Sequence, residues 1–215
     1  MITISKTAEW IQVLYDQLLS ESVQFQAGSS DFFDRLDAIT QLVDLSESDP
    51  SLAQEAYGLM VCGFEKMKEL SGVLKDFIFS TPETKSNQHE LGLLKKLLLQ
   101  EIDSPLLKEY EYVVAYEWWA EHYNSTSGLT EAHQGDIVLM NDRYTFLVVE
   151  LKYIHKANNF WRSIARQQRT GKVCQQARKF GRFFSARFPW ADVEYLALTN
   201  VAIYHGRKDR IRIAV

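Results

Sequence analysis

Apolar residues recur at helical spacing through the first hundred residues, and this pattern predicts a series of helices. The breaks between the apolar stripes carry helix-capping chemistry, as in Gly28-Ser29-Ser30-Asp31 and Asp49-Pro50-Ser51. The stripe that follows the second break either continues as one helix or restarts midway. The expected helices span residues 7–19, 32–43, 52–77, 90–100 and 106–123, the last opened by Ser104-Pro105, with a polar loop at 80–88.

The pattern changes after about residue 125, where short runs of Val, Ile, Leu and aromatic residues replace the helical stripes. Two such runs, Asp136–Met140 and Tyr144–Ile154, flank Asn141-Asp142, and together they predict a β-hairpin. The segment just before it, 124–134, marks a strand poorly. A helix at 172–188 is expected next, followed by strands at 193–198 and 201–204 and a candidate strand at 210–215.

These elements predict an α+β or α/β protein with a helical N-terminal region at 1–104 and a core at 105–215. The core is expected to run helix, mixed β-sheet with hairpin, helix, strands. With 215 residues, 46% of them hydrophobic and few Gly, Pro or Cys, the chain is excluded from the disordered, collagen and disulfide-rich classes. It shows no secretory signal and no apolar run long enough to cross a bilayer, so an intracellular protein, cytoplasmic or nuclear, is expected.

The formal net charge of −4 hides an uneven distribution. Residues 1–150 contain 10 Lys and Arg against 25 Asp and Glu, a net of −15, whereas residues 151–215 contain 14 against 3, a net of +11. No acidic residue occurs between Leu151 and Ala191. Such asymmetry indicates a surface that binds a polyanion. Alternatively, these cations pair with the acidic residues of 1–150, within the chain or across a dimer.

Charged residues interrupt the most apolar part of the predicted hairpin. Glu150 and Lys152 are two residues apart in a strand and therefore share a face. If facing residues have numbers that sum to 286, Asp136 lies opposite Glu150, with Cβ atoms roughly 5 Å apart. A strict two-residue turn gives 285 and places Asp136 opposite Val149 instead. Two carboxylates at that distance favour a cation between them, and oxygen ligands with room for water suit Mg²⁺ or Mn²⁺.

Gly135-Asp136-Ile137-Val138, followed fourteen residues after the aspartate by Glu150-Leu151-Lys152, resembles the active-site pattern of the PD-(D/E)XK nuclease superfamily. The shared restriction-endonuclease-like core of that family runs helix, three strands, helix, strand, which fits residues 106–204. The sequence departs from the pattern at Gly135, where the family name has Pro.

The resemblance implies a metal-dependent nuclease that hydrolyses phosphodiester bonds of DNA or RNA. Asp136, Glu150 and the Leu151 carbonyl would hold Mg²⁺ or Mn²⁺, and Lys152 would position the attacking water. The alternative hypothesis is a non-catalytic nucleic-acid-binding or assembly module that keeps the nuclease fold.

The resemblance also implies further site residues. Family members often add an acidic residue from the helix before the hairpin, and Glu117 is the first candidate here, as a catalytic and metal-binding residue, with Glu121 one turn later as the second. Some members carry a Gln-rich pattern on the helix after the Glu-x-Lys strand, and Gln176 followed by Phe180 is similar to it. The alternative for all these side chains is an ordinary solvated helix surface.

The basic segment that follows the hairpin interleaves cations with aromatic and amide side chains, a mixture that suits phosphate contacts and base stacking. We expect nucleic acid as the partner, DNA before RNA, with no membrane partner. The N-terminal helices offer a surface for a homodimer or a protein partner. The expected nucleic-acid contacts are Lys156, Arg162, Arg166, Arg169, Lys172 and Arg178.

Overall fold

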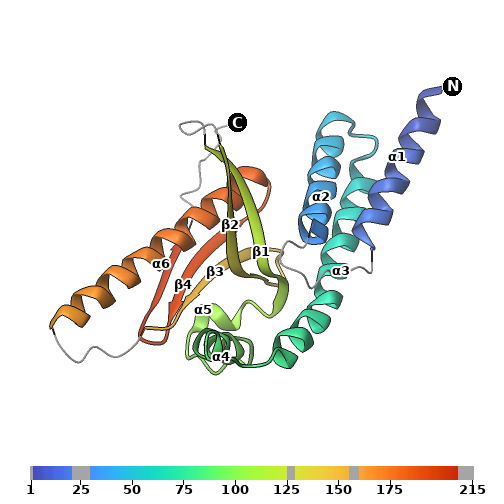
Figure 1. Ribbon diagram of the computed structural model, residues 1–215. Coiled ribbons are helices and arrows are strands. Elements are labelled where there is room, and N and C mark those ends of the chain that lie inside the picture. The colour runs from blue at the N-terminus through green and yellow to red at the C-terminus, as the bar shows by residue number, and fades with distance from the viewer. Residues whose placement is uncertain (1, 21–29, 125–128, 155–159, 208–215) are drawn as a thin grey trace.

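The computed structural model describes residues 2–20, 30–124, 129–154 and 160–207, and within them the chain is an α+β protein in which helices precede a mixed sheet (Figure 1). The elements are α1 (Ile2–Leu18), α2 (Ser30–Ser48), α3 (Ala53–Ser80), α4 (Gln88–Leu98), α5 (Pro105–Lys108), β1 (Tyr112–Asn124), β2 (Leu129–Met140), β3 (Phe146–Lys152), α6 (Phe160–Arg187), β4 (Val193–Thr199) and β5 (Ile203–Arg207).

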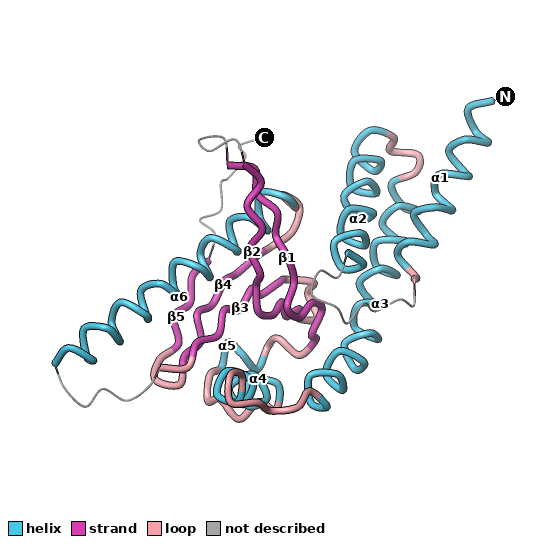
Figure 2. The backbone as a smooth tube through the Cα atoms, in the orientation of Figure 1, coloured by secondary structure: helices cyan, strands magenta, loops and turns pink. Residues whose placement is uncertain are grey.

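The five described strands form one sheet in the order β1-β2-β3-β4-β5, which Figure 2 traces in magenta. The first three strands are antiparallel neighbours. β4 lies parallel to β3, so the chain must cross over between them, and α6 makes that crossing. β5 returns antiparallel along the far side of β4. The hairpin β2–β3 therefore occupies the middle of the sheet, buried on both faces.

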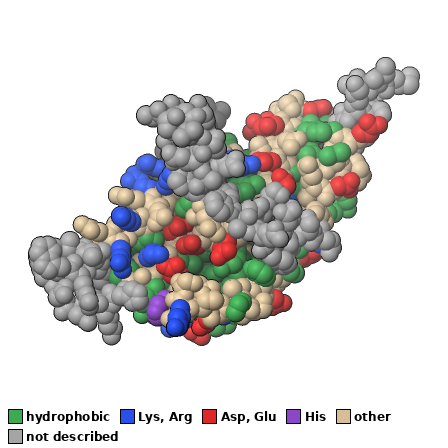
Figure 3. All heavy atoms as spheres, viewed as in Figure 1, with side chains coloured by type: hydrophobic (Ala, Val, Ile, Leu, Met, Phe, Trp, Pro, Cys, Tyr) green, Lys and Arg blue, Asp and Glu red, His purple; other side chains and the backbone are tan. Residues whose placement is uncertain are grey.

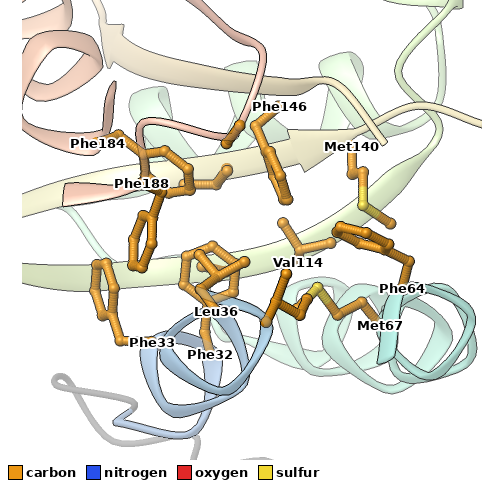
Figure 4. Close-up of a cluster of buried hydrophobic side chains, with 14 of the residues drawn as sticks. Phe32, Phe33, Leu36, Phe64, Met67, Val114, Met140, Phe146, Phe184 and Phe188 are labelled. Carbon is orange, nitrogen blue, oxygen red and sulfur yellow. The ribbon is translucent and has the colours of Figure 1, made fainter. Parts of the chain in front are cut away.

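Alternation along the central strands divides their side chains between two hydrophobic clusters. Val138 and Val148 face the cluster that includes side chains of α1, α2, α3 and α6, while Ile137 and Val149 face the other. Figure 4 shows how aromatic side chains dominate the first cluster. Its labelled members are Phe32, Phe33, Leu36, Phe64, Met67, Val114, Met140, Phe146, Phe184 and Phe188.

The second cluster lies under α4, α5 and the end of α3, which cover the opposite face of the sheet. Leu91, Leu94 and Leu97 recur at helical spacing on α4 and are all buried there. Both clusters draw side chains from each side of residue 104, so the N-terminal helices and the sheet share their cores. In the described part of the chain, no helix is both long and apolar enough to span a bilayer.

The prediction of a helix at 106–123 is wrong. A helix does begin at Pro105, but α5 ends at Lys108, and the chain then enters the long strand β1. The segment is rich in Tyr, Trp and Val, which favour a pleated, half-buried surface. The Ser104-Pro105 signal therefore starts only a short helix, and the composition of the following residues favours a strand. Of the poorly marked segment 124–134, Asn124 ends β1 and residues 129–134 form the first half of β2, while 125–128 lie outside the described residues.

The other elements agree with the expectations more closely. The segment 52–77 is one continuous helix rather than two, and the expected loop at 80–88 separates it from α4. α6 begins at Phe160, twelve residues before the expected start, because its first turns carry Arg, Gln and Ala, which favour helix without any apolar stripe. The candidate strand at 210–215 lies outside the described residues.

Candidate metal and catalytic site

The site lies at the open end of the hairpin β2–β3, where the two strands stop pairing. Regular pairing runs from Met140↔Phe146 to Ile137↔Val149, and every such pair sums to 286. Continuing this register by one step places Asp136 opposite Glu150, so the first of the two alternatives is confirmed and the second is wrong.

Side chains replace the backbone ladder where the strands separate. The Asp136 amide donates to Oε1 of Glu150 at 3.3 Å, and the Leu151 amide donates to Oδ2 of Asp136 at 2.6 Å. The two carboxylates are thereby held between the strands. In a strand, the N–H and C=O of one residue point to the same side, so the Leu151 carbonyl is also directed toward β2.

The opposite end of the hairpin explains this register. The loop between Met140 and Phe146 has five residues, an odd number, as a sum of 286 requires. The Asn141 side chain accepts hydrogen bonds from the backbone amides of Arg143 at 2.9 Å and Thr145 at 3.0 Å. The backbone N–H of Asn141 donates to the Thr145 carbonyl at 3.1 Å. This capping closes a loop that a strict two-residue turn would not make.

Burial perturbs both carboxyl groups. Glu150 is only 4% exposed, and burial, followed by the neighbouring charge of Asp136, raises its pKa to about 9. Burial also raises the pKa of Asp136 to about 6, although the hydrogen bond from the Leu151 amide opposes that shift. Two adjacent charges with little surrounding water are costly, so this setting favours a proton or a cation between the two carboxyl groups.

Lys152 contributes a cation beside this pair. Its Nζ lies 2.5 Å from Oε1 of Glu90, a residue in the first turn of α4. The Glu90 charge raises the pKa of Asp136 and the Lys152 charge lowers it, so both members of the ion pair lie close to the carboxylates. The ion pair is thus part of the site rather than a contact that removes Lys152 from it.

Sequence reasoning missed Glu90. An acidic residue was sought on the helix before the strands, but that helix was expected at 106–123, where the chain forms β1 instead. Of the helices that precede the strands, α4 packs against β3, and Glu90 is its acidic residue in the first turn. The only local signal is an acidic residue in the first turn of that helix, which is common at helix starts and does not by itself indicate a site.

Glu117 lies at the site although it is in a strand and not in a helix. The pairs on either side of it, Tyr116↔Ile137 and Trp118↔Gly135, place it across from Asp136. Its backbone is left-handed, with φ of 47°, an unusual conformation for a non-glycine residue inside a strand. Its charge also raises the pKa of Asp136. The side chain of the second candidate, Glu121, is outside the described part of the structure.

A tyrosine that sequence reasoning also missed supports Glu117. Tyr116 donates its hydroxyl to Oε1 of Glu117 at 3.1 Å and packs edge-on against Phe77 of α3, with ring centroids 6.4 Å apart. Burial first, and then the charge of Glu117, raises the pKa of this phenol. The hydroxyl therefore remains a hydrogen-bond donor beside the carboxylates.

Gly135 precedes Asp136 on β2, and its packing explains why a glycine stands there. Trp118, fully buried, lays its ring against Gly135 on the neighbouring strand, and a Cβ at this position would collide with that ring. Trp118 in turn packs against Phe33 of α2 and Phe180 of α6. The glycine thus lets the aromatic core extend to the residue next to Asp136.

Gln176 does not lie on the face of α6 that packs on the sheet. That face consists of Val173, Ala177 and Phe180, all buried, whereas Gln176 is exposed. The hydrophobic spacing of 173, 177 and 180 already marked the buried face, so this assignment was available from the sequence.

The expected nucleic-acid contacts divide into two groups. Arg169, Lys172 and Arg178 are exposed on α6, and in the described part of the structure none of them pairs with an acidic side chain. Figure 3 shows basic side chains beside the acidic side chains at the centre of the viewed face. Lys156 and the side chains of Arg162 and Arg166 fall outside the described residues.

The alternative of pairing between the basic segment and the acidic helices accounts for only part of this charge. Arg187 binds Asp37 of α2 at 2.7 Å and lies over the Phe33 ring at 4.6 Å. With Lys152–Glu90, this is one of two ion pairs in the described residues that join the basic segment to the acidic one.

The donor set fits a small divalent cation held by few protein side chains. Among the described residues, no group of three or more His, Cys, Asp or Glu side chains is arranged to hold a metal ion. Mg²⁺ is commonly bound through one or two carboxylates and keeps several waters. The adjacent carboxylates of Asp136, which is half-buried, and Glu150, which is buried, have pKa values raised by burial, and with the Leu151 carbonyl they match that kind of site.

Comparison with known proteins adds no relative: no family model, curated protein or solved structure matches this chain.

Proposed function

We propose that this protein is a Mg²⁺- or Mn²⁺-dependent nuclease that hydrolyses phosphodiester bonds. The observation that carries the proposal is the adjacent pair of Asp136, half-buried, and Glu150, buried, at the point where β2 and β3 stop pairing, with Lys152 beside it. Burial raises the pKa of both carboxyl groups, and the charge of Asp136 raises that of Glu150 further, so the ionised pair does not stabilise the folded protein by itself. Perturbed carboxyl groups next to a specific charge partner are typical of functional sites.

The architecture supports the same proposal. The described elements run helix, three antiparallel strands, helix, parallel strand, the order that the resemblance to the PD-(D/E)XK nucleases implies. The hairpin that carries Asp136 and Glu150 lies at the centre of the sheet, and the crossover helix α6 follows it directly. The proposal therefore rests on the residues and on their setting together.

Each residue has a distinct role in this proposal. Asp136, Glu150 and the Leu151 carbonyl would hold the divalent ion, with Glu117 as a further carboxylate close by. When bound, such an ion acidifies a coordinated water and neutralises charge on a phosphate. Lys152 donates a hydrogen bond that orients the attacking water, and Glu90 fixes the Lys152 ammonium within reach of the site.

The exposed cations of α6 would hold the nucleic-acid backbone, because phosphate contacts from Lys and Arg supply most of the non-specific affinity for nucleic acid. Arg169, Lys172 and Arg178 are the described candidates. DNA is the first substrate to test and RNA the second. A non-catalytic nucleic-acid-binding module is the rival proposal, because the exposed cations of α6 would serve binding without cleavage equally well.

The test is a cleavage assay on single- and double-stranded DNA and RNA, with Mg²⁺, Mn²⁺ or EDTA. Glu150→Gln removes the carboxylate while keeping its shape. The matched control is Glu194→Gln, because Glu194 is also a buried glutamate of this sheet, 2% exposed, but pairs with His205 at 2.7 Å.

We expect metal-dependent cleavage by the wild type and by Glu194→Gln, and none by Glu150→Gln. Full activity in Glu150→Gln would overturn the proposal. Salt-sensitive binding of nucleic acid without cleavage, unaffected by loss of Asp136 or Glu150, would establish the rival.

A further inference from the structure

The helix α6 carries cations and amides on its solvent side without any carboxylate. It runs from Phe160 to Arg187 and contains no aspartate or glutamate. Gln168, Lys172 and Gln176 are exposed and follow one another at every fourth position, so they form one polar stripe along the helix. Arg169, also exposed, lies next to Gln168. Gln176 thus belongs to this outer stripe and not to the face that packs on the sheet.

The N-terminal half of α6 is not held by the hydrophobic core. No side chain from Gln167 to Lys172 is buried, and the buried side chains of the described part of this helix begin at Val173. Figure 1 shows the helix diverging from β4 toward its N-terminal end. A helical segment that is polar all round is commonly supported by pairs of opposite charge at helical spacing. Because α6 has no acidic residue, it cannot form such pairs within itself, and this composition favours an anionic partner.

The chemistry of the stripe suits nucleic acid better than a protein surface. The centre of a stable protein–protein interface is commonly apolar and aromatic, and charged residues are depleted there. Gln168, Arg169, Lys172 and Gln176 supply no apolar centre. Arginine and lysine bind phosphate oxygens, and the glutamine amide donates and accepts hydrogen bonds together, as the edge of an adenine requires. The stripe is therefore complementary to a polyanion whose bases are accessible at their edges.

The dimensions of a helix favour one form of nucleic acid. With its side chains an α-helix is about 10–12 Å across, and the major groove of B-form DNA is about 12 Å wide. The major groove of duplex RNA is deep and narrow, and side chains do not reach the bases through it. A single strand has no groove. A polar stripe on a helix that diverges from its own sheet therefore fits duplex DNA.

We propose that Gln168 and Gln176 contact base edges in the major groove of duplex DNA, while the neighbouring cations Arg169 and Lys172 bind its phosphates. The inference rests on the proposed function only in making double-stranded DNA the form that is cut. Since α6 is the crossover between the parallel strands β3 and β4, its N-terminal half lies toward the end of β3 that carries Lys152. Binding in the groove needs no catalysis and can be measured without metal.

The experiment first selects bound sequences from a pool of DNA duplexes with a randomised core, using the whole chain in EDTA so that cleavage does not interfere. An enriched duplex is then compared, by fluorescence anisotropy at several salt concentrations, with its single strands and with an RNA duplex of the same sequence. The double variant Gln168→Ala/Gln176→Ala removes both amides, and Arg169→Ala removes a cation. Gln54→Ala, at an exposed glutamine of α3, is the matched control.

We expect the enriched DNA duplex to bind about tenfold or more tighter than the single strands and the RNA duplex. The double variant should lose about tenfold in affinity for that duplex, together with its sequence preference, because each good base contact discriminates by such a factor. Its slope of log affinity against log salt should stay unchanged, since no phosphate contact is lost, whereas Arg169→Ala should lower that slope by about one. Gln54→Ala should behave as the wild type. Thermal melting of each variant checks that the fold is retained.

Absence of binding to duplex DNA, equal binding of the three nucleic acids, or an unchanged sequence preference in the double variant would overturn the inference. So would a dimer, seen by light scattering, that Arg169→Ala dissociates while DNA stays unbound, because the stripe would then hold the acidic helices of a second copy. The failure of the proposed function looks different. Selective binding of duplex DNA without metal-dependent cleavage would leave the inference standing and remove the nuclease. Metal-dependent cleavage without any preference for duplex DNA would do the reverse.

Discussion

The pKa values of the carboxylates are shifted in opposite directions at the two ends of the hairpin β2–β3. At the loop end, Lys68 of α3 binds Glu65 at 2.9 Å and Asp142 at 3.1 Å. The hydroxyls of Tyr144 and Tyr112 donate to the same two carboxylates, each at 3.0 Å. Hydrogen bonds from Lys68 and then from these tyrosines lower the pKa of both acids.

At the open end, the carboxylates of Asp136 and Glu150 face each other, and burial raises the pKa of both. Lys152, the nearest cation shown, binds Glu90 instead. At the loop end each carboxylate is therefore paired with a cation and a hydroxyl, and the contact joins α3 to the hairpin. At the open end the two carboxylates still favour a proton or a metal ion between them. The carboxylates of the loop end thus stabilise the fold, whereas those of the open end are held in a position suited to chemistry.

Removing the Glu150 carboxylate should have the largest effect, with opposite consequences for cleavage activity and for stability. Glu150→Gln should lower metal-dependent cleavage by more than about 100-fold, the upper range for losing a residue that only supports a metal ligand. The same change removes a buried group that resists ionisation, so the metal-free protein should become more stable by about 1–2 kcal/mol. Cleavage rates and urea unfolding of one preparation measure both. A variant that is less stable and still active would contradict the comparison.

The pH dependence of stability should have opposite signs at the two ends. The folded pKa of Glu150 is raised to about 9 from its ordinary value of 4.5, so its contribution is present below pH 4.5 and is lost as the pH rises to 9. We expect the wild type to lose several kcal/mol of stability relative to Glu150→Gln over that range, at about 1.4 kcal/mol for each pH unit. Melting curves of both proteins from pH 5 to 9, without metal, give the difference.

Added Mn²⁺ should remove most of that loss above pH 7, because the ion takes the place of the proton between the carboxylates. Parallel curves for the two proteins at every pH, with or without Mn²⁺, would show that Glu150 does not carry the perturbation.

Glu90→Gln tests the cation at the open end. Lys152 loses its ionic partner, and we expect cleavage to fall about tenfold through poorer positioning. Removing the Glu90 charge also takes away one cause of the raised pKa of Asp136, so the acid limb of the pH–rate profile should move to lower pH. A lower cleavage rate with an unshifted pH–rate profile would show that Glu90 is only a structural contact of α4.

Lys68→Met tests the loop end and should have the smallest effect. Cleavage should be unchanged, while the melting temperature falls by about 2–4 °C as the contact between α3 and the loop is lost. Because the pKa values of Glu65 and Asp142 are lowered, the contribution of this contact is present above their ordinary pKa values and is lost as the pH falls through the lowered ones. The destabilisation should therefore disappear in acid, which melting curves at pH 3 and pH 7 would detect.

The sequence predicts the central hairpin well, because alternation and turn residues act locally. Asp136 and Glu150 could be paired from their spacing, but the register stayed open until the Asn141 side chain was seen to close a five-residue loop. Glu90 could not be assigned, since it lies 62 residues from Lys152 and leucine spacing on α4 does not reveal which strand the helix covers. The strand β1 was mistaken for a helix because aromatic residues at mixed spacing fit both periods.

The most direct test of the central claim is calorimetric titration of the wild type with Mn²⁺ at neutral pH, in two buffers of different ionisation enthalpy. The account predicts one site per chain with release of a proton, because the Asp136–Glu150 pair holds one before the metal enters. Binding should be lost in Glu150→Gln and kept in Glu194→Gln. An absence of binding to the wild type, or equal binding by Glu150→Gln, would contradict the claim that this pair is a metal site.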